Sequence, residues 1–337
     1  MKNTILSVKD LEVSFDTYEG EIKAVRGVSF EANEGEVLAI VGESGCGKSV
    51  TAQTIMRLNP SPPARIKSGE IILDGLDIIG LEEKRMEAVR GSLVSMVFQD
   101  PMTSLNPTMP VGNQICEALT IHRRMGNGNA FKKAVELLDL VQIPNAGRRA
   151  RQYPHQYSGG MRQRAMIAMA LAYSPKLLIL DEPTTALDAT IQAQIFDLIK
   201  DIQKKTATSI ILITHDLGIV AGLAQRIIIM YAGKIVENGT VDDIFYNSKH
   251  PYTWGLMKSI PRLDQNKTQA LCPIEGMPPD LLAPPEGCAF ADRCDYCMNI
   301  CKEADPLFFD VNNGHKSACW LLHPKAPRLE SICLGGI

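Results

Sequence analysis

One segment has the residue types and spacing of a phosphate-binding loop: Gly42-Glu43-Ser44-Gly45-Cys46-Gly47-Lys48-Ser49. It fits the pattern G-x-x-x-x-G-K-[ST] and lies between an apolar stretch and helical residues 50–57. Glycines let backbone N–H groups surround phosphate oxygens, and the helix N-terminus adds positive potential. We expect Lys48 to reach the β- and γ-phosphates of a nucleotide and Ser49 to hold Mg²⁺. Cys46 occupies a variable position, where we expect it to fill space.

Two adjacent carboxylates, Asp181 and Glu182, follow a short apolar stretch at residues 177–180. A carboxylate at the C-terminal end of a parallel strand lies in the crevice where such sheets bind ligands. Asp181 is suited to hold Mg²⁺, directly or through water, and Glu182 is suited to polarise an attacking water. If the pair stood alone, we would interpret it as two surface acids at the end of a strand. Because the same chain has a phosphate loop, the pair indicates phosphoryl chemistry.

A parallel sheet would bring these groups together, and the apolar stretches predict one. Near-continuous apolar runs occur at residues 37–41, 177–180, 209–213 and 226–230, with helical patterns between them. Such runs are typical of strands in an α/β sheet covered on both faces. Residues 5–30 alternate more and carry turn signals, which predicts an antiparallel edge. We therefore predict an α/β fold with a mixed or parallel sheet.

The composition excludes several classes of protein. The 337 residues are 45% hydrophobic, so the chain can fill a core and is not disordered throughout. The net charge of −3 argues against binding nucleic acid through positive charge. The chain has no apolar run of about 18 residues, the length of a membrane-spanning helix. Its first residues lack the pattern of a signal peptide.

A third pattern lies between the two nucleotide motifs: Tyr157-Ser158-Gly159-Gly160-Met161-Arg162-Gln163-Arg164. It resembles the signature motif of ATP-binding cassette (ABC) ATPases, usually L-S-G-G-Q, with Tyr157 and Met161 as departures. Gln99 resembles that family's Q-loop, residues 185–188 its D-loop, and His215 its switch histidine. The resemblance covers roughly residues 5–245 and implies a P-loop NTPase fold of the ABC type, with a helical subdomain at about 101–165.

The resemblance also implies an ATP site shared by two subunits in a head-to-tail dimer. Catalysis would fall to Lys48, Gln99, Glu182 and His215, and Mg²⁺ would be held by Ser49, Gln99 and Asp181. Further nucleotide contacts would come from Gly42, Ser44, Gly45, Cys46, Gly47 and Val50. Ser158, Gly159 and Gly160 would contact the γ-phosphate on the opposite subunit, with Asp188 in the D-loop. The adenine platform would be Tyr18, with Phe15 second; ordinary strand packing is the alternative for either ring.

The chain after the core resembles the peptide-importing branch of the same family. His250-Pro251-Tyr252-Thr253 matches the segment that follows the core in dipeptide and oligopeptide importer ATPases, and Tyr252 begins an amphipathic turn. We divide the chain into an ABC ATPase domain, residues 1–250, and a C-terminal extension, residues 251–337. Five prolines between residues 272 and 287 indicate an extended segment within this extension.

Cysteines gather in the extension, where the spacing Cys288-x₅-Cys294-x₆-Cys301-x₁₇-Cys319 resembles the C-terminal motif of that branch. Four thiolates suit a [4Fe–4S] cluster, and zinc or free or paired thiols are the alternatives. Cys297 adds ferredoxin-like local spacing and is an alternative ligand. Cys272 and Cys333 lie outside the motif and are expected to be structural. The extension would either staple the fold or sense metal or redox state.

We therefore predict the ATPase subunit of a peptide-importing ABC transporter, peripheral on the cytoplasmic face of the membrane. Its partners would be a second ABC ATPase subunit, homologous or identical, two transmembrane permease subunits and, indirectly, an extracytoplasmic substrate-binding protein, with no nucleic acid. Residues 101–114 would contact the permeases through Met102, Leu105, Met109 and Val111, or else pack internally. The alternatives are import of another solute, such as nickel chelates, and a soluble ABC ATPase outside transport.

Overall fold

The computed structural model describes residues 3–100, 104–123, 125–185, 187–260, 273–312 and 314–327. Its strands are β1 (Thr4–Thr17), β2 (Gly20–Asn33), β3 (Val37–Val41), β4 (Ala64–Leu73), β5 (Leu76–Asp77), β6 (Val94–Val97), β7 (Leu177–Asp181), β8 (Ser209–Thr214), β9 (Arg226–Tyr231), β10 (Lys234–Thr240), β11 (Phe309–Asn312) and β12 (His315–Ser317). Its helices are α1 (Lys48–Ile55), α2 (Glu83–Ser92), α4 (Val111–Arg123), α5 (Asn127–Leu140), α6 (Ala146–Arg149), α7 (Gly159–Ala170), α8 (Ala189–Thr206), α9 (Leu217–Ala221), α10 (Val241–Asn247), α11 (Pro251–Lys258) and α12 (Asn299–Glu303). Short 3₁₀ turns are η1 (Pro154–Gln156), η2 (Ala291–Arg293) and η3 (Trp320–Leu322).

The central sheet has eight strands in the order β11-β12-β10-β9-β3-β8-β7-β6. The strands from β9 to β6 run parallel to their neighbours, and β10, β12 and β11 continue the sheet in antiparallel pairing. Every residue of β3, β7 and β8 is buried, as strands covered on both faces require. The four apolar runs of the sequence are therefore confirmed as strands of an α/β sheet.

The N-terminal strands form a sheet of their own instead of an edge of the parallel sheet. Its order is β2-β1-β4-β5, and its pairs are antiparallel. Leu6, Val8 and Leu11 of β1 pack with Leu38 and Ile40 of β3 in one buried cluster that also contains apolar residues of α1. Burying each such side chain contributes about 1.5–3 kcal/mol. The antiparallel sheet is thus fixed against the strand that leads into the phosphate loop.

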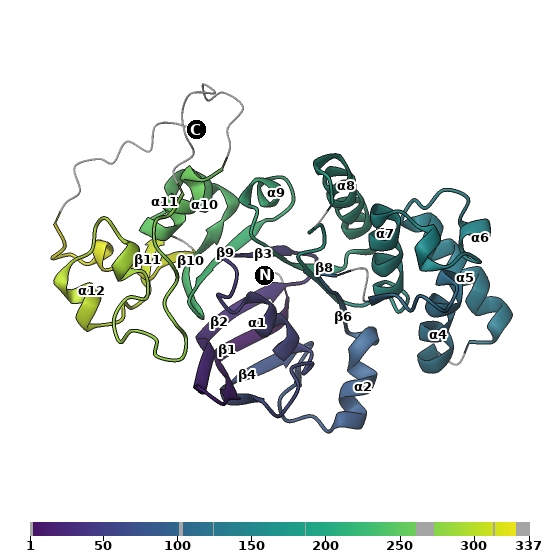
Figure 1. Cartoon of the computed structure of the whole chain (residues 1–337), viewed down its shortest axis with the longest axis horizontal. Coiled ribbons are helices and arrows are strands. Elements are labelled where there is room, and N and C mark those ends of the chain that lie inside the picture. The colour runs from purple at the N-terminus through teal and green to yellow at the C-terminus, as the bar shows by residue number, and fades with distance from the viewer. Residues whose placement is uncertain are drawn as a thin grey trace.

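Helices α4 to α7 form a helical subdomain at one end of the molecule, with the C-terminal residues at the other (Figure 1). Apolar residues of these helices share a buried cluster with residues of β7, β8 and α8. Leu105 and Val111 belong to that cluster and are 2% and 0% exposed. Their assignment to a permease-contacting surface is therefore wrong, and the alternative of internal packing is confirmed for both. Pro101 and Met102 lie outside the described residues.

The C-terminal residues share a core with the strands that carry the nucleotide motifs. Tyr252 of α11 and Phe290 lie in one buried cluster with Val41, Ile229 and Tyr231. The Tyr231 and Tyr252 rings are 4.6 Å apart, and Phe290 meets Tyr231 edge-on at 5.3 Å. β12 pairs with β10, so the extension also lengthens the central sheet. The extension is held on the central sheet by both apolar contacts and strand pairing.

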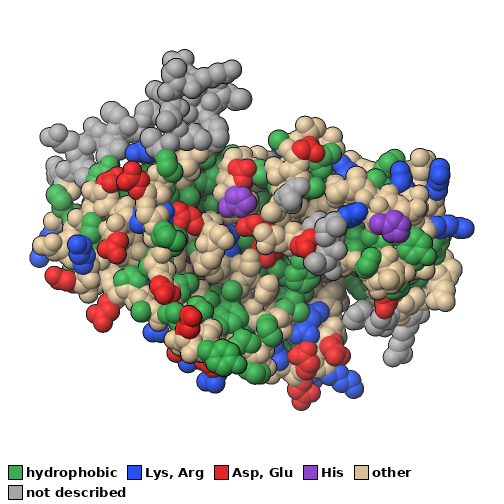
Figure 2. Space-filling model, in the orientation of Figure 1, with side chains coloured by type: hydrophobic (Ala, Val, Ile, Leu, Met, Phe, Trp, Pro, Cys, Tyr) green, Lys and Arg blue, Asp and Glu red, His purple; other side chains and the backbone are tan. Residues whose placement is uncertain are grey.

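Helix α11 begins where the sequence predicts an amphipathic turn. Pro251 occupies its first turn, and His250 caps it by accepting the Tyr252 N–H at Nδ1 (3.1 Å). Burial lowers the pKa of His250 to about 4, so the imidazole is neutral at physiological pH and Nδ1 can accept. In the ranges described above, we find no helix with the length and apolar character needed to cross a membrane. Figure 2 shows acidic and basic side chains interspersed over one face, in keeping with the near-neutral net charge.

Candidate active site

Strand register brings the predicted catalytic residues to one edge of the central sheet. Val41 pairs with Thr214, and Asp181 pairs with Ile213, so β3, β7 and β8 end at nearly the same level. The residues that follow these strands are the phosphate loop, Glu182 and His215. This is the edge at which open α/β sheets bind ligands, because the connections there leave a crevice.

The glycines of the phosphate loop are required by close backbone contacts. Gly47 has φ +96°, and a Cβ there would lie 2.4 Å from the carbonyl oxygen of Ala24. A Cβ on Gly42 would lie 2.2 Å from the carbonyl oxygen of Met230. Gly45, at φ +78°, also adopts the left-handed conformation that favours glycine. The loop therefore keeps its shape only with glycine at Gly42 and Gly47.

Lys48 spans the loop from the first turn of α1. Its side chain is buried, and Nζ donates hydrogen bonds to the carbonyl oxygens of Gly42 (2.8 Å) and Glu43 (2.9 Å). Cys46 is 4% exposed, and burial raises the pKa of its thiol, so it fills space as a neutral group, as predicted. The ammonium group is thus held inside the loop, where it can bind the phosphates of a nucleotide.

Ser49 and Asp181 form the oxygen pair expected for Mg²⁺. The Ser49 hydroxyl donates to Oδ1 of Asp181 at 2.9 Å. Asp181 is 3% exposed, and burial raises the pKa of its carboxyl, an effect that the Ser49 hydrogen bond partly offsets. A hydroxyl and a carboxylate are hard oxygen donors, which is the ligand chemistry of Mg²⁺. The two residues therefore fit the metal that accompanies a bound nucleotide.

Glu182 is the centre of a second cluster, directly after the strand that carries Asp181. Its Oε2 accepts from Nε2 of Gln99 (2.9 Å) and from the Thr185 hydroxyl (3.1 Å), and its Oε1 lies 3.4 Å from Nδ1 of His215. Glu182 has φ +44°, a left-handed conformation that costs about 1–3 kcal/mol outside glycine. Its N–H donates to the Ile213 carbonyl at 2.9 Å, which holds this backbone in place. The predicted catalytic residues Gln99, Glu182 and His215 are thus brought together.

These groups surround one cavity of about 720 Å³. The lining comprises Phe15, Ile22, Ala24, Glu43, Ser44, Gly45, Gly47, Lys48, Ser49, Val50, Gln99, Glu182, His215 and Leu281. The cavity is wide enough for a nucleotide and has a charged end beside Lys48 and Glu182 and an apolar end beside Phe15 and Ile22.

Tyr18, our first choice for the adenine platform, does not line this cavity. Thr17 pairs with Gly20, so Tyr18 stands at the tip of the β1–β2 hairpin and its side chain is fully exposed. Phe15, our second choice, lies two residues before Thr17 in β1, pairs with Ile22 and lines the cavity. The structure thus brings Phe15 and not Tyr18 to the cavity, because the length of this hairpin decides which ring lies there.

The signature residues lie at the start of α7, and they are not among the described residues that line the cavity. Ser158 caps α7 by accepting the Met161 N–H at 3.3 Å, and Asp188 caps α8 by accepting the Ile191 N–H at 2.9 Å. A Cβ on Gly160 would lie 2.7 Å from the Ile191 side chain, so glycine allows the two helix starts to approach. Ala186 of the D-loop lies outside the described residues. Within one subunit, the two halves of the predicted ATP site are therefore apart.

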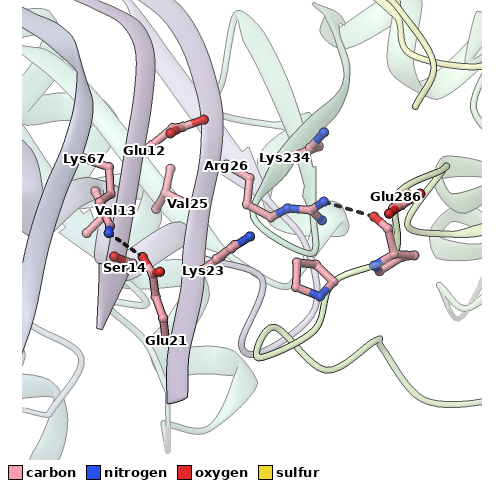
Figure 3. Close-up of a pocket in the computed structure, with 12 residues that line it drawn as sticks. Glu12, Val13, Ser14, Glu21, Lys23, Val25, Arg26, Lys67, Lys234 and Glu286 are labelled. Carbon is pink, nitrogen blue, oxygen red and sulfur yellow. Dashed lines mark hydrogen bonds and ion pairs between the residues drawn. The ribbon is translucent and has the colours of Figure 1, made fainter. Parts of the chain in front are cut away.

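A second cavity, of about 520 Å³, lies between the antiparallel sheet and the extension (Figure 3). Lys67 pairs with Glu21 across one wall at 2.9 Å. On the other wall, Arg26 donates a hydrogen bond to the carbonyl oxygen of Pro285 at 3.3 Å. Lys234, also in the lining, pairs with Asp305 of the extension. These contacts place the proline-rich segment of the extension against β2 beside the nucleotide site.

The predicted iron–sulfur cluster is not supported, and the zinc alternative is not supported either. Among the residues that the structure describes, no group of three or more His, Cys, Asp or Glu is arranged to hold a metal ion. Cys288, Cys294, Cys301, Cys319 and the alternative ligand Cys297 are free cysteines. Burial raises the pKa of Cys288 and of Cys319 to about 12 and that of Cys294 to about 11, so their thiols are protonated at neutral pH.

The stapling that we assigned to a metal is supplied by protein contacts. Cys288 donates its N–H to the carbonyl of Cys301 at 2.7 Å, and Trp320 Nε1 donates to the Ala304 carbonyl at 2.9 Å. Phe290 enters the shared core, and β12 pairs with β10. Cys spacing in the sequence was therefore a poor guide to ligand geometry. Cys272 and Cys333 fall outside the described residues.

Four residues in or behind the lining of this cavity were missed: Glu43 and Leu281 line it, and Tyr252 and Arg293 contact Glu43. Glu43 stands at a variable position of the loop pattern, and the other three lie more than 200 residues further along the chain, in the segment that we treated as an accessory. The signal for Arg293 in the sequence was only its place beside Cys294. Tyr252 and Leu281 carried no signal that distinguishes them from core residues.

Two family models match the chain. The model described as ABC transporter matches residues 25–185, and the model described as oligopeptide/dipeptide transporter, C-terminal region, matches residues 236–301. The first match contains the phosphate loop, Gln99 and the Asp181–Glu182 pair, and the second begins in β10 and ends at Cys301. Both parts of the chain therefore have family counterparts.

Curated relatives match over nearly the whole chain. The oligopeptide transport ATP-binding protein OppD of Bacillus subtilis is 59% identical over 326 residues, which are 97% of this chain and 91% of that protein. The dipeptide transport ATP-binding protein DppD of the same organism is 55% identical over 96% of each chain. Among solved structures, the ATP-binding cassette MJ0796, in a dimeric post-hydrolysis state with ADP and Pi, matches with a TM-score of 0.63 at 27% identity, over 70% of this chain and 98% of that one.

Proposed function

This chain belongs to the oligopeptide and dipeptide branch of the ABC transporter family, and from that premise we propose how it powers peptide import. It is the ATP-hydrolysing subunit of a peptide importer. The observation that carries the mechanism is the convergence of three groups on one cavity: Lys48 in its loop, the Ser49–Asp181 pair, and Glu182 with Gln99 and His215.

ATP binds with its triphosphate in the phosphate loop and its base toward the apolar end of the cavity. Backbone N–H groups of the loop and the N-terminus of α1 face the phosphate oxygens, and Lys48 binds the β- and γ-phosphates. Phe15 is the ring that stacks on the adenine, because it lines the cavity whereas Tyr18 is exposed. The remaining loop contacts come from Ser44, Gly45 and Val50.

Hydrolysis requires a positioned water and stabilisation of the charge that develops on the γ-phosphate. Glu182 polarises the water, and its hydrogen bonds from Gln99 and Thr185 hold the carboxylate in one orientation. His215, beside Glu182, contacts the γ-phosphate oxygens and stabilises their charge together with Lys48. Ser49, Asp181 and Gln99 would hold Mg²⁺, and the bound ion would neutralise phosphate charge.

A second ABC ATPase subunit, homologous or identical, completes the site. Its signature segment covers the γ-phosphate, while Ser158, Gly159 and Gly160 of this chain cover the partner's ATP, and Asp188 lies at the same interface. Support comes from the lining of this chain's own cavity, which does not include the signature residues, and from the dimeric ATP-binding cassette of known structure that this chain resembles. We place the pair on the cytoplasmic face of the membrane, where closure on ATP moves two permease subunits that receive peptide from an extracytoplasmic binding protein.

The experiment is ATP hydrolysis by the assembled transporter in lipid vesicles. We expect turnover to rise when the binding protein is supplied with di- or oligopeptides and to require both ATPase subunits. A rise with nickel chelates and not with peptides would contradict the cargo. Purification with nucleic acid instead of membrane subunits would contradict the transporter role, which the match of the C-terminal region already disfavours.

A further inference from the structure

The carboxylate of Glu43, within the phosphate loop, is held by a side chain of the C-terminal extension. The two guanidinium nitrogens of Arg293 donate to the two carboxylate oxygens, at 2.7 Å and 3.0 Å. The residues are 250 positions apart in the sequence. The Arg293 side chain is 5% exposed and that of Glu43 is 25% exposed, so water screens the pair only in part. A bidentate pair of this kind fixes both the charge and the orientation of the carboxylate.

Other contacts hold Arg293 in this orientation. Its Nε donates to the Glu275 carbonyl (2.9 Å), and its terminal nitrogens also donate to the Ile274 carbonyl (3.2 Å) and to the Tyr231 hydroxyl (3.1 Å). The guanidinium carbon lies 5.7 Å from the centre of the Tyr231 ring. Although burial opposes it, the hydrogen bonds to Glu43 and Tyr231 raise the pKa of Arg293 further. Arg293 is therefore a permanent cation at a fixed place.

The extension contacts the same loop residue a second time. The Glu43 N–H donates to the hydroxyl of Tyr252 at 2.9 Å, and Tyr252 is fully buried. Leu281 of the extension lines the nucleotide cavity, and its carbonyl accepts the N–H of Lys23 in β2 at 2.9 Å. Figure 3 shows the neighbouring region, where Arg26 of β2 reaches the proline-rich segment. The extension is therefore part of the wall of the nucleotide site.

Glu43 poses an electrostatic problem for that site. Glu43 lines the cavity together with Ser44, Lys48 and Ser49, where the proposed function places a triphosphate of several negative charges. An unpaired carboxylate there would repel the phosphates, and the repulsion would be stronger than in water because the site is partly buried. Arg293, which is not among the residues that line the cavity, offsets this charge through the ion pair.

We propose that Arg293 is a positioning residue of the nucleotide site: by neutralising Glu43 and fixing its orientation, it sets the affinity of the phosphate loop for triphosphates. The C-terminal extension then tunes ATP binding through this ion pair. The proposal rests on the use of ATP in the proposed function and not on peptides as the cargo.

The test is calorimetric titration of the full chain with MgATP and MgADP. We expect Arg293→Ala to weaken ATP binding about tenfold and ADP binding less, because ADP carries less phosphate charge. Adding Glu43→Gln to Arg293→Ala should recover most of the loss, because the unpaired carboxylate is then gone. The loss should also shrink in about 0.5 M salt. Lys316→Ala is the matched control, since it removes an extension cation whose exposed partner is Asp310, and it should change the affinity less than twofold.

Equal losses of ATP affinity for Arg293→Ala and for the double variant would overturn the proposal. If Arg293 only supported the fold, Glu43→Gln would not restore the affinity. No loss in Arg293→Ala would overturn it as well. Circular dichroism and Tm check folding, and if Arg293→Ala does not fold, Arg293→Gln gives the same comparison with a hydrogen-bond donor retained. Failure of the wild-type chain to bind ATP would instead contradict the proposed function.

Discussion

The hydroxyl of Ser49 lies 2.9 Å from Oδ1 of Asp181, although 132 residues of chain separate them. Ser49 is the second residue of α1, the helix after the phosphate loop, and Asp181 is the last residue of β7, which lies two places from β3 in the sheet. The fold thus places two hard oxygen ligands together before any metal arrives. This preorganisation has a cost, because Asp181 is buried and its ionised form is disfavoured.

Asp181→Asn is expected to stabilise the nucleotide-free chain while it weakens binding of MgATP. The pKa of Asp181 is raised in the folded state, so the folded chain binds more protons than the unfolded chain between the unfolded and folded values. In that window stability falls as pH rises, and the loss persists at neutral pH. We expect Asn to raise Tm at pH 7 by about 2 °C and to make this part of the pH–stability curve flatter.

The matched measurement is ATP affinity with and without Mg²⁺. We expect Asp181→Asn to lose about tenfold or more in affinity when Mg²⁺ is present and much less in EDTA. Ser49→Ala should show the same dependence on Mg²⁺ without the gain in Tm, because it leaves the buried carboxylate in place. An equal loss of affinity in both buffers would contradict the metal role of the pair.

Phe15→Ala is expected to raise the KM for ATP about fivefold, because the ring lines the cavity and would stack on adenine. Tyr18→Ala, three residues away at the exposed hairpin tip, should change the KM less than twofold. Rates of ATP hydrolysis over a range of ATP concentrations give the KM of both variants. A larger effect at Tyr18 than at Phe15 would restore our first choice from the sequence.

Gly160→Ala is expected to prevent the ATP-dependent dimer without abolishing ATP binding to the same chain. A Cβ at Gly160 would lie 2.7 Å from Ile191, so the start of α7 must shift, whereas the phosphate loop is untouched. The Gly160→Ala substitution is made in a Glu182→Gln chain, and light scattering in the presence of MgATP measures the fraction of dimer. Gly128→Ala in α5 is the control, because a Cβ there meets no described atom within 4 Å. Dimer formation by the Gly160→Ala variant would show that the signature segment is not at the interface.

Much of this site could be predicted from the sequence, because its chemistry lies in short segments. The spacing from Gly42 to Ser49 and the apolar strand before it encode a phosphate loop by local conformation alone. Asp181 and Glu182 follow from the same reasoning, since the end of a buried parallel strand is where ligands bind. The order of strands in the sheet then brings the phosphate loop and the Asp181–Glu182 pair together.

Contacts between distant segments could not be predicted in this way. Nothing local to Glu43 or Arg293 indicates that they form an ion pair, because the pairing depends on how the extension packs against β3 and β9. The cysteines show the reverse error, since a spacing that suits metal ligands does not by itself arrange the donors to hold a metal ion; among the described residues no such group is found. Leu105 and Val111 likewise carried an apolar pattern that fits a surface for a partner and a core equally well.

We propose that Glu182 polarises the water that attacks ATP, and Glu182→Gln in the assembled transporter tests this role most directly. The glutamine side chain has nearly the size of glutamate and stays close enough to contact Gln99 and Thr185. The variant therefore loses only the negative charge. ATP turnover, measured as phosphate release with peptide-loaded binding protein, should fall about 100-fold or more, while ATP still binds and the ATP-bound dimer accumulates. Turnover close to that of the wild type would contradict the account.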